Sequence, residues 1–316
     1  MKRIISIVLI ITMVLTAATA VTSDDLDAKM EEFANTFADF IPRASTQMNL
    51  WADAHIGNIL PLSGLPHLGG GLTFGGVLVP TDFMSVFGDA FSEGVPEWES
   101  FPIPAISVDA RVGGIILPFD LGLHIMALDD YEADFYGVKI SIPNSFVFGA
   151  DVRFAILQEG VICPALSLGV GYTYTSGDFT LTSEPLITTD VLSLLTNESY
   201  MSTHLEYTTH IYSATAQLSK KILLITPFIG AKAIAQKGQY TGWGEYKDIS
   251  NCSNEADDIN DIFYTFEKDD LTDKNLKFSV FAGVGVDFLI IQTTIGVNYD
   301  FTDQSWAGSI SLHVKI

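Results

Sequence analysis

Two Asp-x-Arg pairs are the clearest candidates for chemistry in this chain. Asp109 and Arg111 form one pair, and Asp151 and Arg153 form the other. Residues two apart on a β-strand point to the same face, so each acid can bridge to its own base or to a neighbouring strand. The pairs therefore predict a structural ion-pair network inside a narrow barrel, with the alternative that they set the constriction of a small polar pore.

Further ionisable residues fall on the same face of the predicted strands. We expect the side chains that line the lumen to be Asp109, Arg111, Asp120, His124, Asp151, Arg153, Lys232, Lys277, Asp287 and Asp300.

Other candidate sites are weaker. His204, Glu206 and His210 could serve a hydrolase, but no serine nucleophile stands in a suitable local context, so we expect no catalysis. The segment 239–274 is rich in Asp and Glu but lacks the register and glycine of an EF-hand, which favours a solvated surface loop over a Ca²⁺ site. The spacing of His and Cys predicts no zinc site, and no phosphate loop or cofactor fingerprint is present.

Strands must position these residues, and the sequence marks them by strict alternation. Four segments consist of two alternating strands joined by a short connection, namely 106–127, 145–175, 210–236 and 276–301. In each, one row of side chains is apolar and the other is polar or small, which is the period of β-structure.

The connections between these hairpins are long and polar, over 129–144, 176–201 and 239–274. Short turns at one end and long loops at the other are typical of an outer-membrane β-barrel, with the short turns periplasmic. A soluble β-sandwich, the alternative, has no reason to sort its loops by length. The apolar row is therefore expected to face lipid.

Ten strands are expected in an all-β, antiparallel, up-and-down transmembrane barrel. The four hairpins supply eight, the segment 69–80 one, and the segment ending at Ile316 the closing strand. Alternation within 46–58 and 135–142 leaves a count of twelve open. Aromatic residues at the loop-side ends of strands predict an interfacial girdle: Phe146, Phe148, Tyr172, Tyr174, Tyr299, Phe301 and Trp306.

The first residues indicate export. Lys2 and Arg3 precede an apolar run and a small-residue cleavage pattern, so 1–20 is predicted to be a signal peptide. Residues 21–68 form a predicted periplasmic or plug segment with a helix over 24–41, and 69–316 the barrel. The segment either docks beneath the barrel or enters its lumen, because the helix has an apolar stripe to bury.

Composition narrows the partners. The formal net charge is −22, which argues against binding nucleic acid or an anionic membrane surface. Hydrophobic residues make up 48% and charged residues 17% of the chain, and two cysteines exclude a disulfide scaffold. We expect outer-membrane lipid, the barrel-assembly machinery and periplasmic chaperones as partners. Small solutes are a further class of partner if the barrel transports.

The signal peptide, the hatch-like segment 21–68, the Gly- and aromatic-rich strands and the long loops together resemble outer-membrane β-barrels of the spirochaete type. The architecture is distantly similar to the family that moves long-chain fatty acids across the outer membrane. This resemblance implies a porin-like or hydrophobic-solute channel with a narrow or plugged lumen. The alternative is a non-transporting barrel that acts in adhesion or envelope integrity.

Overall fold

The computed structural model describes residues 40, 43–57, 67–80, 100–114, 117–135, 138–183, 199–248, 262–268 and 276–316. The predicted signal peptide and nearly all of the predicted helix over 24–41 lie outside these residues. The strands are β1 (Leu68–Pro80), β2 (Ser100–Gly113), β3 (Phe119–Phe135), β4 (Val138–Leu157), β5 (Ala165–Ser183), β6 (Ser199–Ser219), β7 (Ile225–Asp248), β8 (Ile262–Lys268), β9 (Lys277–Phe288), β10 (Ile291–Asp300) and β11 (Ser305–Lys315).

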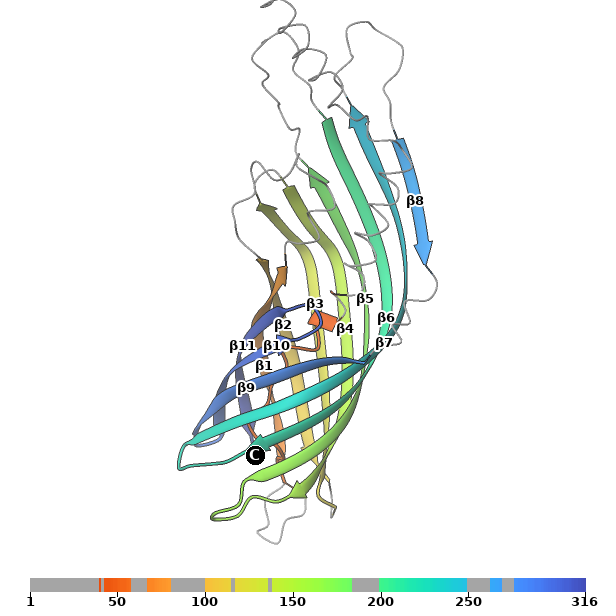
Figure 1. Ribbon diagram of the computed structural model, residues 1–316. Helices are drawn as coiled ribbons and strands as arrows, with labels where there is room; N and C mark the ends of the chain where they lie inside the picture. The colour runs from red at the N-terminus through yellow and green to blue at the C-terminus, as the bar shows by residue number, and fades with distance from the viewer. Residues whose placement is uncertain are drawn as a thin grey trace, which may run out of the picture.

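Ten of these strands close into one antiparallel barrel, as predicted (Figure 1). The sheet runs in the order β6-β5-β4-β3-β2-β1-β11-β10-β9-β7, and a pairing between β6 and β7 completes the ring. β8 pairs with residues 240–246 of β7, whereas β9 pairs with residues 225–234 of the same strand. The ring is therefore up-and-down, with β8 above β9 on one edge of β7.

On the side of the barrel that carries the short turns, the outward face is apolar and the inward face is mainly polar. On β10 and β11, the outward Ile295 and Ile310 are 52% and 55% exposed, whereas the inward Gln292 and Ser311 are buried. An apolar exterior around a polar interior is the pattern of a transmembrane β-barrel, since the outer row contacts hydrocarbon. The prediction that the apolar row faces lipid is confirmed.

The predicted aromatic residues lie on the outward face. Tyr299 packs against Phe301 and Trp306, with ring centroids 5.1 and 4.7 Å apart. On the opposite wall Tyr172 contacts Tyr212, with ring centroids 5.6 Å apart. Such residues mark the level at which the hydrocarbon ends, and we call the apolar-faced part of the barrel on the short-turn side of them the belt.

Strands β3 to β7 rise higher than β1, β2 and β9 to β11 (Figure 1), and β4 to β6 continue past their aromatic residues. β7 has 24 residues, whereas β10 has 10, so one wall of the barrel stands taller than the other. We call the raised part of this wall the extension; it comprises residues 131–135, 138–145, 176–183, 199–209 and 237–248.

The extension reverses the faces of the belt. Its large inward side chains are apolar or aromatic and at most 5% exposed: Ile140, Ile142, Phe179, Leu181, Leu205, Tyr207 and Tyr240. Its outward side chains include Lys139, Glu132 and Glu206, which are 49%, 58% and 67% exposed. The extension therefore has the burial pattern of a sheet in water.

The structure corrects several predicted boundaries. The described residues of the loop expected over 129–144 are strand, and residues 136–137 lie outside the described part. Of the loop expected over 176–201, residues 176–183 belong to β5 and residues 199–201 to β6. The segment 239–274 contains the end of β7 and all of β8. Residues 46–57 form no strand, which removes the basis for twelve. The described parts of these segments resemble loops in composition because their outward residues are polar. Their backbone nevertheless forms β-strands.

Two further features complete the fold. Among the described residues, no helix is long and apolar enough to cross a membrane. Cys163 is free and exposed in the short connection between β4 and β5, while Cys252 lies outside the described residues.

Candidate functional site: the occupied lumen

An ion-pair network crosses the interior of the belt between β2, β3 and β4. Arg111 contacts Asp120 at 2.6 Å and Asp151 at 2.7 Å. Arg153 also binds Asp120, donating from Nε and Nη2 at 2.9 Å each. Asp120 is fully buried, and its carboxylate is shared by two guanidinium groups.

Strand register explains why each arginine binds across strands and not to the aspartate of its own Asp-x-Arg pair. Asp120 lies directly opposite Arg153, and Gly122 lies between Arg111 and Asp151 in the ladder. Directly opposed residues are closer than residues two apart on one strand. A Cβ at Gly122 would collide with the guanidinium of Arg111, so this glycine provides the space for the ion pair.

A second cluster surrounds His313 on β11. Its Nε2 lies 3.1 Å from a carboxylate oxygen of Asp109, and its ring stacks on Trp51 with centroids 4.0 Å apart. Thr73 donates to Asp109 at 3.2 Å. The guanidinium of Arg111 lies 5.6 Å from the Trp51 ring, so the indole connects the two clusters by a cation–π contact.

Residues 43–57, which we call the plug, fill the centre of the barrel. Their backbone is bound by side chains from the wall: Arg153 donates to the carbonyl of Asp53 at 2.8 Å, and Gln217 to that of Trp51 at 2.7 Å. Lys232 donates to the carbonyl of Thr46 at 2.6 Å. The wall thus supplies the hydrogen-bond partners that a strand neighbour would otherwise provide.

Charged contacts fix both ends of the plug. Arg43 lies 3.4 Å from Asp300 and also binds Asp303. Asp53 accepts from Lys315 at 2.7 Å, and Lys315 also contacts Asp287 at 2.8 Å. These contacts join the plug to β10, β11 and β9, on the side of the barrel away from the network of Arg111 and Arg153.

Glycines in the wall accommodate the apolar side chains of the plug. A Cβ at Gly69 would meet the Trp51 ring at 2.6 Å, and one at Gly285 would meet the Cβ of Ala52 at 2.5 Å. A Cβ at Gly296 would lie 2.6 Å from a methyl group of Leu50. Leu50 and Ala52 form a small buried core with Phe228 and Phe281.

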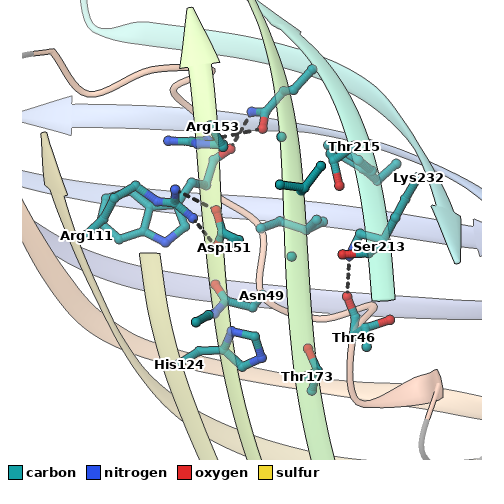
Figure 2. Close-up of a pocket in the computed structure, with 18 residues that line it drawn as sticks. Thr46, Asn49, Arg111, His124, Asp151, Arg153, Thr173, Ser213, Thr215 and Lys232 are labelled. Carbon is teal, nitrogen blue, oxygen red and sulfur yellow. Dashed lines mark hydrogen bonds and ion pairs between the residues drawn. The ribbon is translucent and has the colours of Figure 1, made fainter. Parts of the chain in front are cut away.

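Little space remains around the plug. A cavity of about 80 Å³ lies between it and β2 to β7; Figure 2 shows Arg111 and Asp151 on one side of this cavity and Thr215 and Lys232 on the other. A second cavity, of about 50 Å³, is lined mainly by apolar side chains, among them Phe40, Met48 and Ile142. Both are small beside a drug-sized ligand site of roughly 300–1,000 Å³.

All ten side chains expected to line the lumen point to the interior, where they occupy different surroundings. Asp120, Asp151, Arg111 and Arg153 form the network described above. His124 and Lys232 line the larger cavity, and Asp109 binds His313. Asp287 contacts Lys315, and Asp300 contacts Arg43 of the plug. Lys277 is 3% exposed at the start of β9.

Arg43 and Asp53 were not predicted as partners of the wall, because the plug has no regular period. Lys221, in the turn before β7, contacts Asp287 at 2.8 Å and was also missed. His313 and Lys315 alternate with the apolar row of β11, which puts them on the inward face, although their partners were not predicted.

Comparison with known proteins adds similarity at the level of architecture. No protein-family model matches the chain, and no curated protein matches it. Among the solved structures that resemble it, three share a sequence identity of 10% or less.

The outer-membrane protease OmpT from Escherichia coli matches with a TM-score of 0.44 and 9% identity, over 79% of this chain and 96% of that one. The translocator domain of the autotransporter NalP from Neisseria meningitidis gives 0.38 and 10%, over 93% and 99%. A FadL homologue from Pseudomonas aeruginosa gives 0.29 and 10%, over 85% and 99%. These three similarities concern the fold alone, and the spirochaete resemblance stays a prediction. The closed barrel with its apolar outer face gives the chain the fold of an outer-membrane β-barrel.

Proposed function

We propose that this protein is an outer-membrane channel for small, partly hydrophobic solutes, closed by its plug and opened when the plug is displaced. Catalysis is not part of this proposal. The observation that carries it is the way the plug is held: its backbone is bound largely by wall side chains, through Arg153, Gln217 and Lys232.

Contacts of this kind can be exchanged for contacts with water. A net hydrogen bond contributes only about 0.5–1.5 kcal/mol, because the same groups bind water when separated. A plug fastened by such bonds in a polar lumen can leave without breaking the barrel, whose strands remain paired around the ring.

The apolar cavity favours a hydrophobic solute over an ion. It lies between Ala44 and Met48 of the plug and Ile142, Val147 and Tyr207 of the tall wall. An apolar solute that enters from the extension would therefore meet the plug at this point.

The second candidate is a structural barrel that transports nothing. The network of Arg111, Asp120, Asp151 and Arg153 favours it, since these residues brace β2, β3 and β4 to one another directly. Removing one partner of a buried pair typically costs about 3–5 kcal/mol, so the network has a clear role in stability without any transport.

A disulfide between the plug and the wall distinguishes the two. The Cβ of Leu50 lies 3.5 Å from the position of a Cβ on Gly296, which suits a disulfide. We would introduce Leu50→Cys and Gly296→Cys in a chain with Cys163→Ser and Cys252→Ser, and record conductance in planar bilayers.

For a displaceable plug, we expect silence when the disulfide is oxidised and opening events after reduction. Lys315→Ala, which removes a contact to Asp53, should make openings more frequent. The single variant Leu50→Cys in the same background should not respond to reductant. Silence of the reduced protein and of Lys315→Ala would instead establish the structural barrel.

A further inference from the structure

Three potential metal ligands converge on the outward face of the extension, on the side of the sheet opposite the lumen. Asp178 lies on β5, and His204 and Glu206 lie on β6. One ligand atom from each residue falls within 4.8 Å of the other two. The plug and the interior network use none of these side chains.

The imidazole of His204 is oriented for binding. Its Nδ1 lies 3.0 Å from the Thr180 hydroxyl, and its Nε2 lies 3.6 Å from a carboxylate oxygen of Glu206. The ring of Trp243, on β7, packs beside it with centroids 5.4 Å apart. A metal-bound histidine is commonly oriented by a hydrogen bond at its other ring nitrogen, and Thr180 occupies that position at Nδ1, which directs Nε2 toward the carboxylates.

The two carboxylates are directly opposed. Asp178 and Glu206 are register partners in the β5–β6 ladder, and like charges placed opposite each other destabilise a sheet. Among the residues that the structure describes, neither forms an ion pair with a lysine or arginine. A bound cation would relieve this repulsion, which is an argument independent of the histidine geometry.

The location gives a metal access from water. These residues lie beyond Tyr172, Tyr174 and Tyr212, hence outside the belt. The side chain of Glu206 is 67% exposed and that of His204 20% exposed.

We propose that Asp178, His204 and Glu206 form a surface site for a divalent transition-metal ion, with Zn²⁺ as the fitting ion. One imidazole and two carboxylates match the ligands that Zn²⁺ takes, whereas an all-oxygen set suits Ca²⁺ or Mg²⁺. Three protein ligands leave a coordination position for water. The linear spacing of His and Cys gave no zinc signal because the ligands come from two strands and only their register brings them together.

The test is calorimetric titration of the full-length refolded protein with Zn²⁺. We expect saturable binding of one ion, and His204→Asn should weaken the affinity more than tenfold. Thr180→Val should weaken it on the order of 10- to 100-fold, as is found when the hydrogen-bond partner of a metal-bound histidine is removed.

His210→Asn is the matched control. His210 also faces outward on β6, but it lies 2.7 Å from the Tyr172 hydroxyl and outside the cluster, so the affinity should not change. Heat-modifiable gel mobility confirms that each variant is folded. Unchanged affinity in His204→Asn, a failure to saturate, or binding of Ca²⁺ as tight as that of Zn²⁺ would each overturn the proposal.

Discussion

Strand β6 passes through two regions of the molecule that bury opposite kinds of side chain. In the belt its inward residues are polar, as with Gln217, and outward Leu218 is 39% exposed. In the extension Leu205 is inward and fully buried, while its neighbour Glu206 is outward and exposed. The alternation continues along the strand, but the apolar row changes sides.

The surrounding medium explains the change. In the belt the outer row meets hydrocarbon, and the inner row binds the backbone and charged groups of the plug, so most apolar residues belong outside. In the extension the outer row meets water, so apolar residues belong inside, as in a soluble sheet. The period of a sequence thus predicts a strand, whereas the medium decides which face of the strand is apolar.

The largest expected effect on stability is at the buried inward residues of the extension. Phe179→Ala removes a fully buried ring on β5 and should lower the free energy of unfolding by about 3–5 kcal/mol. Leu168→Ala on the same strand, outward in the belt, should cost much less because lipid fills the space. Urea unfolding in lipid vesicles measures both, and a larger loss for Leu168→Ala would refute the assignment of faces.

A charge on the outer row should have an intermediate effect in the belt. Ile295→Arg places a guanidinium in hydrocarbon and should cost about 2–4 kcal/mol, with poor assembly. Asn144→Arg, which is exposed in the extension, should stay within about 0.5 kcal/mol of the parent. Equal losses for the two in the same assay would mean that the extension also lies in lipid.

The smallest effect is expected at an ion pair on the outside of the extension. Lys139 contacts Glu132 at 3.0 Å, and both side chains are about half exposed. Lys139→Ala should therefore change the unfolding free energy by about 0–1 kcal/mol, falling further at high salt. A loss as large as that of Phe179→Ala would show that this surface is shielded from water.

Much of the barrel could be predicted from the sequence, because lipid imposes strict alternation. The hairpins 106–127, 145–175, 210–236 and 276–301 each contain a pair of barrel strands, and the count of ten is confirmed. The strand ends were missed where β3 to β7 enter water. Polar residues are common both in loops and on the water-facing side of a sheet, so composition cannot distinguish a loop from such a strand.

The interior was less predictable. Alternation identifies which side chains point inward, but the choice of Arg153 as partner for Asp120 depends on register between β3 and β4. The plug contacts of Arg43 and Asp53 depend on where an irregular segment folds, and no period reports that. Whether the plug moves depends on differences in free energy that a sequence pattern does not record.

The position of the plug in the chain has a consequence for assembly. Trp51 and Asp53 precede β1, yet they bind His313 and Lys315 on β11, which also pairs with β1 to close the ring. Contacts across 262 residues of sequence must await the arrival of the final strand, and contacts of such long range form slowly. Closure of the ring and anchoring of the plug on this side therefore depend on the same strand, so a chain that stops before β11 would leave the barrel unsealed and its plug unanchored there.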